Sequence, residues 1–347
     1  MVKRFGLNFL VLIASFLLVL ALTEIVLRCT IYNLKNYVQS PGPDAVYVIE
    51  TAEFKTKIKT NSLNMRDGEI LSKAPGEYRI LCLGDSFTFG LGVNIPETYP
   101  KVAEKILRES GYRASVINGG TQGNVEDAIQ FLIEKGLRFK PDLAALQIYI
   151  GNDFYDELRH ENKNAGRAEE PIRRNIFLDA KRVLKGIRLR TLEFFWTRLV
   201  QIRWIDDILF RFDLRYDNRG IFLRTYPPLE KKLVTEELTG LEKIRSLCEK
   251  EGVSLVFLLV PAKQQVFKKH LLNNDKYDYK KPNRILKDFC AGYSIPCIDF
   301  LEIYETLPDE TVRGFYYNQD QHWTVRGHAQ AGETLAEFIR EHAKPSF

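Results

Sequence analysis

Short apolar runs alternate with amphipathic segments along most of this chain. In the first half the alternation covers five consecutive segments, at 79–83, 99–109, 114–117, 125–134 and 143–150. In the second half it resumes with helix-like and strand-like segments at 238–250, 254–260, 283–290, 296–300 and 324–341. Strands that alternate with helices are typical of a parallel sheet covered on both faces. The pattern therefore predicts an α/β fold, a three-layer α/β/α sandwich around a parallel sheet.

An uncharged run of roughly 19 residues near the amino terminus, at 5–23, is long enough to cross a bilayer as one helix. Lys3 and Arg4 precede it, and basic residues on the short side favour an extracytoplasmic position for the remainder. A cleaved signal peptide is the alternative, although no small-x-small cleavage pattern follows the run. We expect residues 1–30 to form one N-terminal transmembrane helix that anchors an extracytoplasmic or periplasmic domain.

Between the two alternating regions lies a segment of different composition, at 155–235. It contains 18 basic and 12 acidic residues, so its positive excess is larger than the formal net charge of +5 of the whole chain. Large apolar residues recur among arginines at a helix-like spacing over 180–212. We interpret the segment as a helical subdomain packed on the sheet; a lid, or a surface for anionic headgroups or an acidic polymer, is the alternative. The expected domains are the anchor at 1–30, a linker at 31–78 and a main domain at 79–347 that contains this insert.

The composition excludes several classes of protein. The chain lacks the long Lys/Arg runs of a nucleic-acid-binding tail, so we expect no nucleic-acid partner. Its 5 cysteines form no C-x-x-C pair and show no metal-ligand spacing, which favours buried thiols over a metal site. We therefore expect no metal and no cofactor. The sequence does not indicate an oligomeric state.

A serine follows the first predicted strand of the main domain, in Gly84-Asp85-Ser86. Open α/β sheets bind their ligands at the carboxyl ends of the strands, and Gly84 allows a tight turn there. The backbone N–H of the serine could then point at a developing oxyanion. A phosphate-binding loop is a competing interpretation, but the segment lacks the Lys-Ser/Thr ending of such loops. Ser86 is therefore a candidate nucleophile, with a simple helix N-cap as the alternative.

A base and a carboxylate for this serine are available in Asp320-Gln321-His322, just before the last predicted helix. A nucleophilic serine needs a base, and the base needs an orienting carboxylate. In an extended segment, residues two apart point to the same side, so both side chains can face one site. His328 is a rival base, but it lies within the predicted final helix, where packing or capping is the expected role.

Two further loops follow predicted strands and contain suitable oxyanion donors. The first is Asn118-Gly119-Gly120-Thr121-Gln122-Gly123-Asn124, and the second is Gly151-Asn152-Asp153. A tetrahedral intermediate needs fixed hydrogen-bond donors beside the nucleophile, and a glycine N–H or an asparagine amide can serve. Each loop by itself would pass as an ordinary connection. Their common position at strand ends predicts one shared site.

Together, these four segments resemble blocks I, II, III and V of the SGNH/GDSL hydrolase superfamily. The resemblance implies that Ser86 is the nucleophile and one oxyanion donor, and that His322 is the base with Asp320 as its partner. It further implies Gly123 as the second donor, with Gly120 as a less favoured substitute, and Asn152 as the third. Asp153 is interpreted as a structural residue of its loop.

The last block departs from the superfamily pattern. Members usually carry Asp-x-x-His, whereas this chain has Asp320-x-His322 followed by Trp323. The shorter spacing is similar to that of the alginate O-acetyltransferase branch. It makes Asp299, at the end of a predicted strand, the reserve candidate for the carboxylate. The segment at 61–67 and the amino-terminal apolar run also resemble membrane-tethered bacterial members.

The function implied is serine-dependent hydrolysis of an acyl ester, an esterase or deacetylase activity on an extracytoplasmic glycan or lipid. The first alternative is an O-acyltransferase that modifies an exopolysaccharide through the same acyl-enzyme. The two differ in whether water or a sugar hydroxyl accepts the acyl group. The second alternative is a non-catalytic component that binds or assembles polysaccharide.

Overall fold

The computed structural model describes residues 2–30, 42–51, 53–121, 123–151, 190–199, 202–211 and 219–342. The chain divides into two compact units. The first comprises residues 1–35, 50–52 and 169–215, and the second comprises residues 36–49, 53–168 and 216–347. Each unit is considered by itself.

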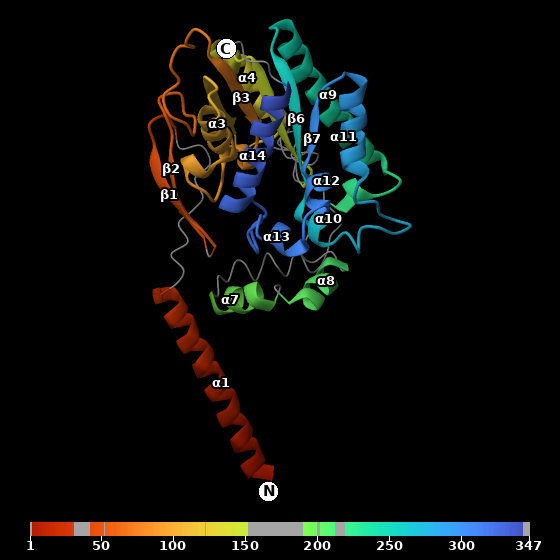
Figure 1. Cartoon of the computed structure of the whole chain (residues 1–347). Helices are drawn as coiled ribbons and strands as arrows, with labels where there is room; N and C mark the ends of the chain where they lie inside the picture. The colour runs from red at the N-terminus through yellow and green to blue at the C-terminus, as the bar shows by residue number, and fades with distance from the viewer. Residues whose placement is uncertain are drawn as a thin grey trace, which may run out of the picture. The chain divides into compact units, whose positions relative to one another are not determined.

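The first unit is helical in its described part. It contains α1 (Val2–Thr30), α7 (Arg190–Leu199) and α8 (Arg203–Arg211), shown in Figure 1. The backbone N–H and the hydroxyl of Thr191 both donate to the Glu24 carboxylate, at 2.8 and 2.9 Å, and so tie α7 to α1. The helix-like spacing predicted over 180–212 is thus present in α7 and α8, while the rest of that segment lies outside the described residues.

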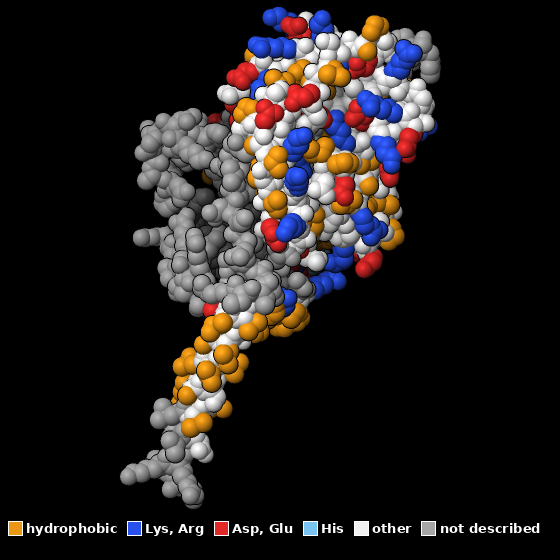
Figure 2. Space-filling model, turned by 90° about the vertical axis from the view of Figure 1, so that its left-hand side faces the viewer, with side chains coloured by type: hydrophobic (Ala, Val, Ile, Leu, Met, Phe, Trp, Pro, Cys, Tyr) orange, Lys and Arg blue, Asp and Glu red, His pale blue; other side chains and the backbone are white. Residues whose placement is uncertain are grey.

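The expected membrane anchor is not supported by the structure. A helix does form over Val2–Thr30, and Figure 2 shows apolar side chains along it. Yet within the described ranges no helix is both long enough and apolar enough to cross a bilayer. α1 is a long helix with many exposed apolar side chains.

The second unit is built on a five-stranded parallel sheet in the order β4-β3-β5-β6-β7. The strands are β3 (Tyr78–Gly84), β4 (Ala114–Gly120), β5 (Leu143–Tyr149), β6 (Ser254–Val260) and β7 (Cys297–Asp299). Every residue of β5 is buried, as expected for a strand covered on both faces. The predicted α/β fold with a parallel sheet is confirmed.

Helices cover both faces of this sheet (Figure 1). The longer ones are α3 (Tyr99–Glu109), α4 (Val125–Glu134), α9 (Pro228–Lys250), α11 (Lys281–Gly292) and α14 (Val325–His342). α14 packs on α3, and α4 packs on α9. Glycines allow both approaches: a Cβ on Gly332 would lie 2.8 Å from the carbonyl oxygen of Tyr99, and one on Gly240 2.8 Å from a Val125 methyl. The sheet is thus enclosed between two helical layers.

Shorter elements connect these parts. The α-helical ones are α2 (Ser86–Phe89), α10 (Lys263–Phe267), α12 (Phe300–Glu305) and α13 (Asp309–Arg313). The 3₁₀ turns are Ile95–Glu97, Gly136–Phe139 and Arg219–Phe222. Cys82, Cys248 and Cys290 are buried free thiols, as the sequence predicted, and Cys297 is half-buried.

Residues ahead of the main sheet form a small two-stranded sheet of β1 (Val46–Glu50) and β2 (Lys55–Lys59). Ile49, Phe54 and Ile58 pack with Phe89 and Leu91, which end and follow α2. The apolar cluster therefore fixes this sheet against the segment that begins with Ser86.

Arg66 lies in the same region and is fully buried. Its guanidinium donates to three backbone carbonyls after the start of α2, those of Phe89, Gly90 and Val93. Burial lowers the pKa of Arg66 to about 10. Because this pKa is still well above 7, the side chain remains charged at neutral pH. One charged group thus satisfies the carbonyls of the loop that leaves the site.

The variant Arg66→Lys is expected to lower the free energy of unfolding by about 2–3 kcal/mol, because a single ammonium cannot reproduce the planar fork of donors in a buried place. The midpoint of urea unfolding measures the loss. Arg108→Lys, at a side chain that is 60% exposed and pairs with Glu104, is the matched control and should leave the midpoint unchanged. Equal midpoints for Arg66→Lys and the parent protein would contradict this account of Arg66.

Candidate active site

Ser86 is held on a tight turn between β3 and α2. Gly84 ends the strand with φ +147°, and a Cβ there would lie 2.4 Å from the Gln147 side-chain oxygen and 2.5 Å from the Thr88 hydroxyl. Asp85 caps α2 by accepting a hydrogen bond from the Phe87 N–H at 2.8 Å. Ser86 is therefore the first residue of a short helix whose start is fixed by its neighbours.

Gly84→Ala is expected to lower the free energy of unfolding by about 2–4 kcal/mol, because it combines a strained φ with a clash against buried side chains. Gly252→Ala is the matched control: Gly252 also has a positive φ, +68°, but a Cβ there meets nothing within 4 Å. The control should lower the free energy of unfolding by only about 1 kcal/mol, the cost of placing alanine at a positive φ. Thermal or urea unfolding of both variants measures the difference, and equal losses would show that the close packing at Gly84 is unimportant.

The structure brings Ser86, His322 and Asp320 together from opposite ends of the second unit's chain. The Ser86 hydroxyl lies 2.7 Å from Nε2 of His322, and Nδ1 of His322 lies 2.5 Å from Oδ1 of Asp320. A carboxylate accepts from Nδ1–H, which leaves Nε2 as the acceptor for the serine proton. The three side chains thus form a continuous hydrogen-bonded chain that can move a proton off the serine.

The short Asp-x-His spacing has a simple structural basis. Oδ1 of Asp320 accepts from the backbone N–H of His322 at 2.8 Å as well as from its ring. Burial favours the neutral acid, but hydrogen bonds from His322 and the nearby charges of His322 and Lys263 outweigh it and lower the pKa of Asp320. Asp320 is therefore ionised at neutral pH and holds the imidazole in place.

The reserve carboxylate lies elsewhere. Asp299 caps α12 by accepting from the Leu301 N–H at 2.9 Å, and it accepts from the Asn283 amide at 2.8 Å. Burial raises its pKa. The structure thus pairs His322 with Asp320 and gives Asp299 a capping position.

His328, the rival base, is fully buried in α14. Its Nδ1 accepts from the Tyr99 backbone N–H at 3.2 Å, and its ring stacks on that tyrosine. Burial lowers its pKa to about 3, so it is neutral near pH 7. These contacts match the packing role expected of it.

The predicted oxyanion donors are placed only in part. The Gly123 N–H lies 3.3 Å from the Thr121 hydroxyl, while the Gly120 N–H donates to the Asn118 side chain at 3.0 Å. Gly123 lines the same pocket as Gly84 and Asp85, next to the serine. Asn152 and Asp153 lie outside the described residues, so their predicted roles stay predictions.

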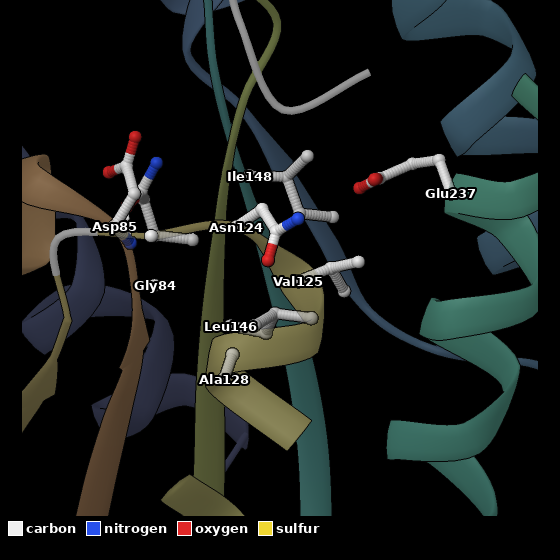
Figure 3. Close-up of a pocket in the computed structure, with 10 residues that line it drawn as sticks. Gly84, Asp85, Asn124, Val125, Ala128, Leu146, Ile148 and Glu237 are labelled. Carbon is white, nitrogen blue, oxygen red and sulfur yellow. Dashed lines mark hydrogen bonds between the residues drawn. The ribbon is translucent and has the colours of Figure 1, made fainter. Parts of the chain in front are cut away.

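A small pocket lies beside the turn that carries Ser86 (Figure 3). Besides Gly84, Asp85 and Gly123, its wall comes from the start of α4, from β5 and from α9. The contributing residues are Asn124, Val125, Ala128, Leu146, Gln147, Ile148 and Glu237, and all of these except Gln147 are labelled in Figure 3. The wall is mostly apolar; Asp85 lies on the side of the turn, and the Glu237 carboxylate lies on the opposite side, on α9 (Figure 3).

Aromatic rings cover the histidine on its inner side. The Phe87 ring lies 5.1 Å from the rings of both His322 and Trp323, and Phe300 lies 5.4 Å from Trp323. Trp323 is 1% exposed and His322 is 7% exposed. The tryptophan that follows the histidine in sequence is thus a packing residue beneath the base.

Sequence reasoning missed two residues that hold the loop with the acid and the base. Lys263 and Glu53 both bind backbone groups of residues 317–320. Lys263 closely follows the apolar run at 254–260, so its place at a strand end was a signal that could have been used. Glu53 lies ahead of the main sheet, where no motif marks it.

Part of the chain is similar to proteins of a known family. Residues 222–346 match the family described as "SGNH hydrolase-like domain, acetyltransferase AlgX". The chain is also 30% identical over 159 residues to the alginate biosynthesis protein AlgX of Pseudomonas putida. That alignment covers 44% of this chain and 30% of the relative, so the chain spans less than a third of that protein.

The chain is also similar in fold to several solved structures. Two are TesA, at 13% identity and a TM-score of 0.44, and a lipase/acylhydrolase from Enterococcus faecalis, at 14% and 0.45. They cover 76% and 78% of this chain, and the chain covers 98% and 99% of them. An acetyl xylan esterase, AlAXEase, matches at 10% identity and a TM-score of 0.44, over 75% of this chain and 99% of its own.

Proposed function

We propose that this chain, a member of the SGNH hydrolase superfamily with a carboxyl-terminal part related to AlgX, is a serine-dependent acyl-ester enzyme. The observation that carries the proposal is the hydrogen-bonded chain from Ser86 through His322 to Asp320. A serine hydroxyl is a poor nucleophile unless a positioned base removes its proton, and this arrangement supplies one. It also speaks against a purely binding role, which would not require the three groups in this order.

In the proposed reaction Ser86 attacks the carbonyl of an acyl ester while Nε2 of His322 takes the serine proton. His322 then returns that proton to the leaving alkoxide, and Asp320 stabilises the imidazolium in between. The backbone N–H groups of Ser86 and Gly123 and the amide of Asn152 are the proposed oxyanion donors. The acyl group is left on the Ser86 oxygen. In the second half of the reaction it passes to an acceptor hydroxyl, whose proton His322 takes and then returns to the Ser86 oxygen as the acyl–serine bond breaks.

For the acceptor we propose a hydroxyl of an exopolysaccharide rather than water. The support is the match to the AlgX acetyltransferase family, because the matched residues include Asp320 and His322. The relative itself is named for alginate biosynthesis. Hydrolysis by the same acyl-enzyme, the esterase function predicted first, is the alternative; it requires only that water reach the acyl group.

The test supplies an activated acetyl ester together with a de-acetylated acidic polysaccharide, and follows both free acetate and polymer-bound acetyl. We expect acetyl on the polymer and a rate that rises with polymer concentration. Release of free acetate at a rate that the polymer does not change would instead identify an esterase. If the protein is well folded and forms neither free acetate nor polymer-bound acetyl, the acyl-ester proposal is contradicted.

A further inference from the structure

The loop that carries the acid and the base is held from one side by a buried lysine. Lys263 begins α10, directly after the carboxyl end of β6, and is 7% exposed. Its ammonium donates to three backbone carbonyls of the loop, those of Tyr317 at 2.7 Å and of Asn318 and Asp320 at 3.0 Å each. Three carbonyl oxygens therefore converge on the three donors of one ammonium.

A carboxylate holds the same loop from a different part of the chain. Glu53 accepts from the backbone N–H of Gln319, at 2.9 Å for the nearer oxygen, and from that of Asp320 at 2.8 Å. The loop thus donates its N–H groups to an anion and directs its carbonyls at a cation. The backbone of Asp320 takes part in both contacts, through its carbonyl with Lys263 and through its N–H with Glu53. Both charged side chains therefore act directly on the residue that orients His322.

The charge of Lys263 has an effect beyond its hydrogen bonds. The ammonium is one of the groups that lower the pKa of Asp320, after the contacts with His322. The titratable and charged groups around the pair come from several elements. They are Glu53 ahead of β2, Lys263 of α10, Tyr317 of the loop itself, Tyr149 of β5, Asp85 beside Ser86, and His328 of α14. Among them Lys263 is a cation in direct contact with the loop.

We infer that Lys263 is a positioning residue of this active site: it fixes the loop of Asp320 and His322 through three backbone hydrogen bonds and places a positive charge beside the pair. Its effect on the reaction rests on the proposed function. A nearby positive charge opposes protonation of the imidazole, so removing it stabilises the protonated ring. The acidic limit of activity then moves to higher pH. Glu53 acts with the opposite sign, because its negative charge favours the protonated ring.

The experiment compares Lys263→Met and Lys263→Arg in the full chain, with Lys281→Met as the matched control. Lys281 also donates to two backbone carbonyls, those of Leu223 and Arg224 at 2.9 Å each, and neither carbonyl belongs to this loop. The first readout is the pH titration of the His322 ring by NMR, which needs no acyl chemistry. The second is the rate at which a fluorophosphonate labels Ser86 as a function of pH.

For Lys263→Met we expect the midpoint of both pH curves to rise by about 0.5–1 pH unit. Labelling at neutral pH should slow by about 10–100-fold, because the base is less well placed. Lys263→Arg keeps the charge and should keep the midpoint, even where its different shape slows labelling. Lys281→Met should change neither curve.

Glu53→Gln provides the test with the opposite sign and keeps an oxygen that can accept from the loop. We expect it to lower the ring-titration midpoint of His322. If both Lys263→Met and Glu53→Gln fold and neither changes the midpoint of the His322 ring titration, the inference is overturned. If Lys263→Met does not fold, an unchanged midpoint in Glu53→Gln overturns it. Failure of the proposed function gives a different result. In that case the His322 ring titration shifts as predicted in the variants, but the fluorophosphonate does not label the wild-type protein.

Discussion

Replacing Ser86 by alanine is expected to abolish covalent labelling by a fluorophosphonate and to slow acyl-ester turnover by about 10⁴–10⁶-fold. The hydroxyl lies 2.7 Å from Nε2 of His322, so the variant loses both the nucleophile and the group whose proton the base takes. Residual turnover would come only from binding and from the oxyanion donors. The measurement is the labelling rate together with ester turnover at saturating substrate.

Ser110→Ala is the control for this prediction. Ser110 is an exposed residue at the carboxyl end of α3, outside the site. It should label and turn over substrate at the wild-type rate. Both alanine variants should unfold at the same denaturant concentration as the parent, within about 0.5 kcal/mol of stability. Persistent labelling of Ser86→Ala would place the reactive residue elsewhere in the chain.

Asp320→Asn is expected to reduce turnover by about 10³–10⁴-fold with little change in stability. An asparagine amide cannot stabilise the imidazolium, and it permits the ring tautomer in which Nε2 carries the proton and cannot accept one. The loss should appear in the acylation rate, because Asp320 acts on the serine proton through His322. Single-turnover kinetics with an activated ester measures it.

Asp299→Asn provides the comparison between the two candidate carboxylates. Asp299 is bonded to Asn283 and to the start of α12, so its amide variant should lose stability and keep its turnover per folded molecule. A larger catalytic loss in Asp299→Asn than in Asp320→Asn would reverse the assignment. The two variants carry the same chemical change, so the difference reports position alone.

The strands of the main domain could be predicted closely because a parallel sheet buried on both faces requires near-continuous apolar runs. The runs at 79–83 and 143–150 correspond to Tyr78–Gly84 and Leu143–Tyr149, and the run at 254–260 coincides with Ser254–Val260. The carboxyl ends of parallel strands then meet at one edge. That rule predicts one shared edge for the loops that contain Ser86 and Gly123. His322 precedes the last helix, and its role as the base for Ser86 is implied by the resemblance to the superfamily.

Other parts of the site could not be predicted because their signal lies in contacts between distant segments. Arg66 and Glu53 are single charged residues in segments without periodicity, and nothing in their neighbours shows that they bind backbone groups of other loops. The sequence also could not decide between Asp320 and Asp299 as the partner of His322. Their hydrogen-bond partners decide it, because Asp320 binds the His322 ring and Asp299 binds Asn283 and the start of α12.

In the proposed reaction Ser86 carries an acyl group between its two halves. The most direct measurement is intact-protein and peptide mass spectrometry after rapid quenching of wild-type protein mixed with an activated acetyl ester. We predict one acetyl adduct, located on the peptide that contains Ser86, formed faster as pH rises through the acidic limit and absent from Ser86→Ala. Turnover of the ester without any adduct on that peptide, under conditions where deacylation is slow, would contradict the claim.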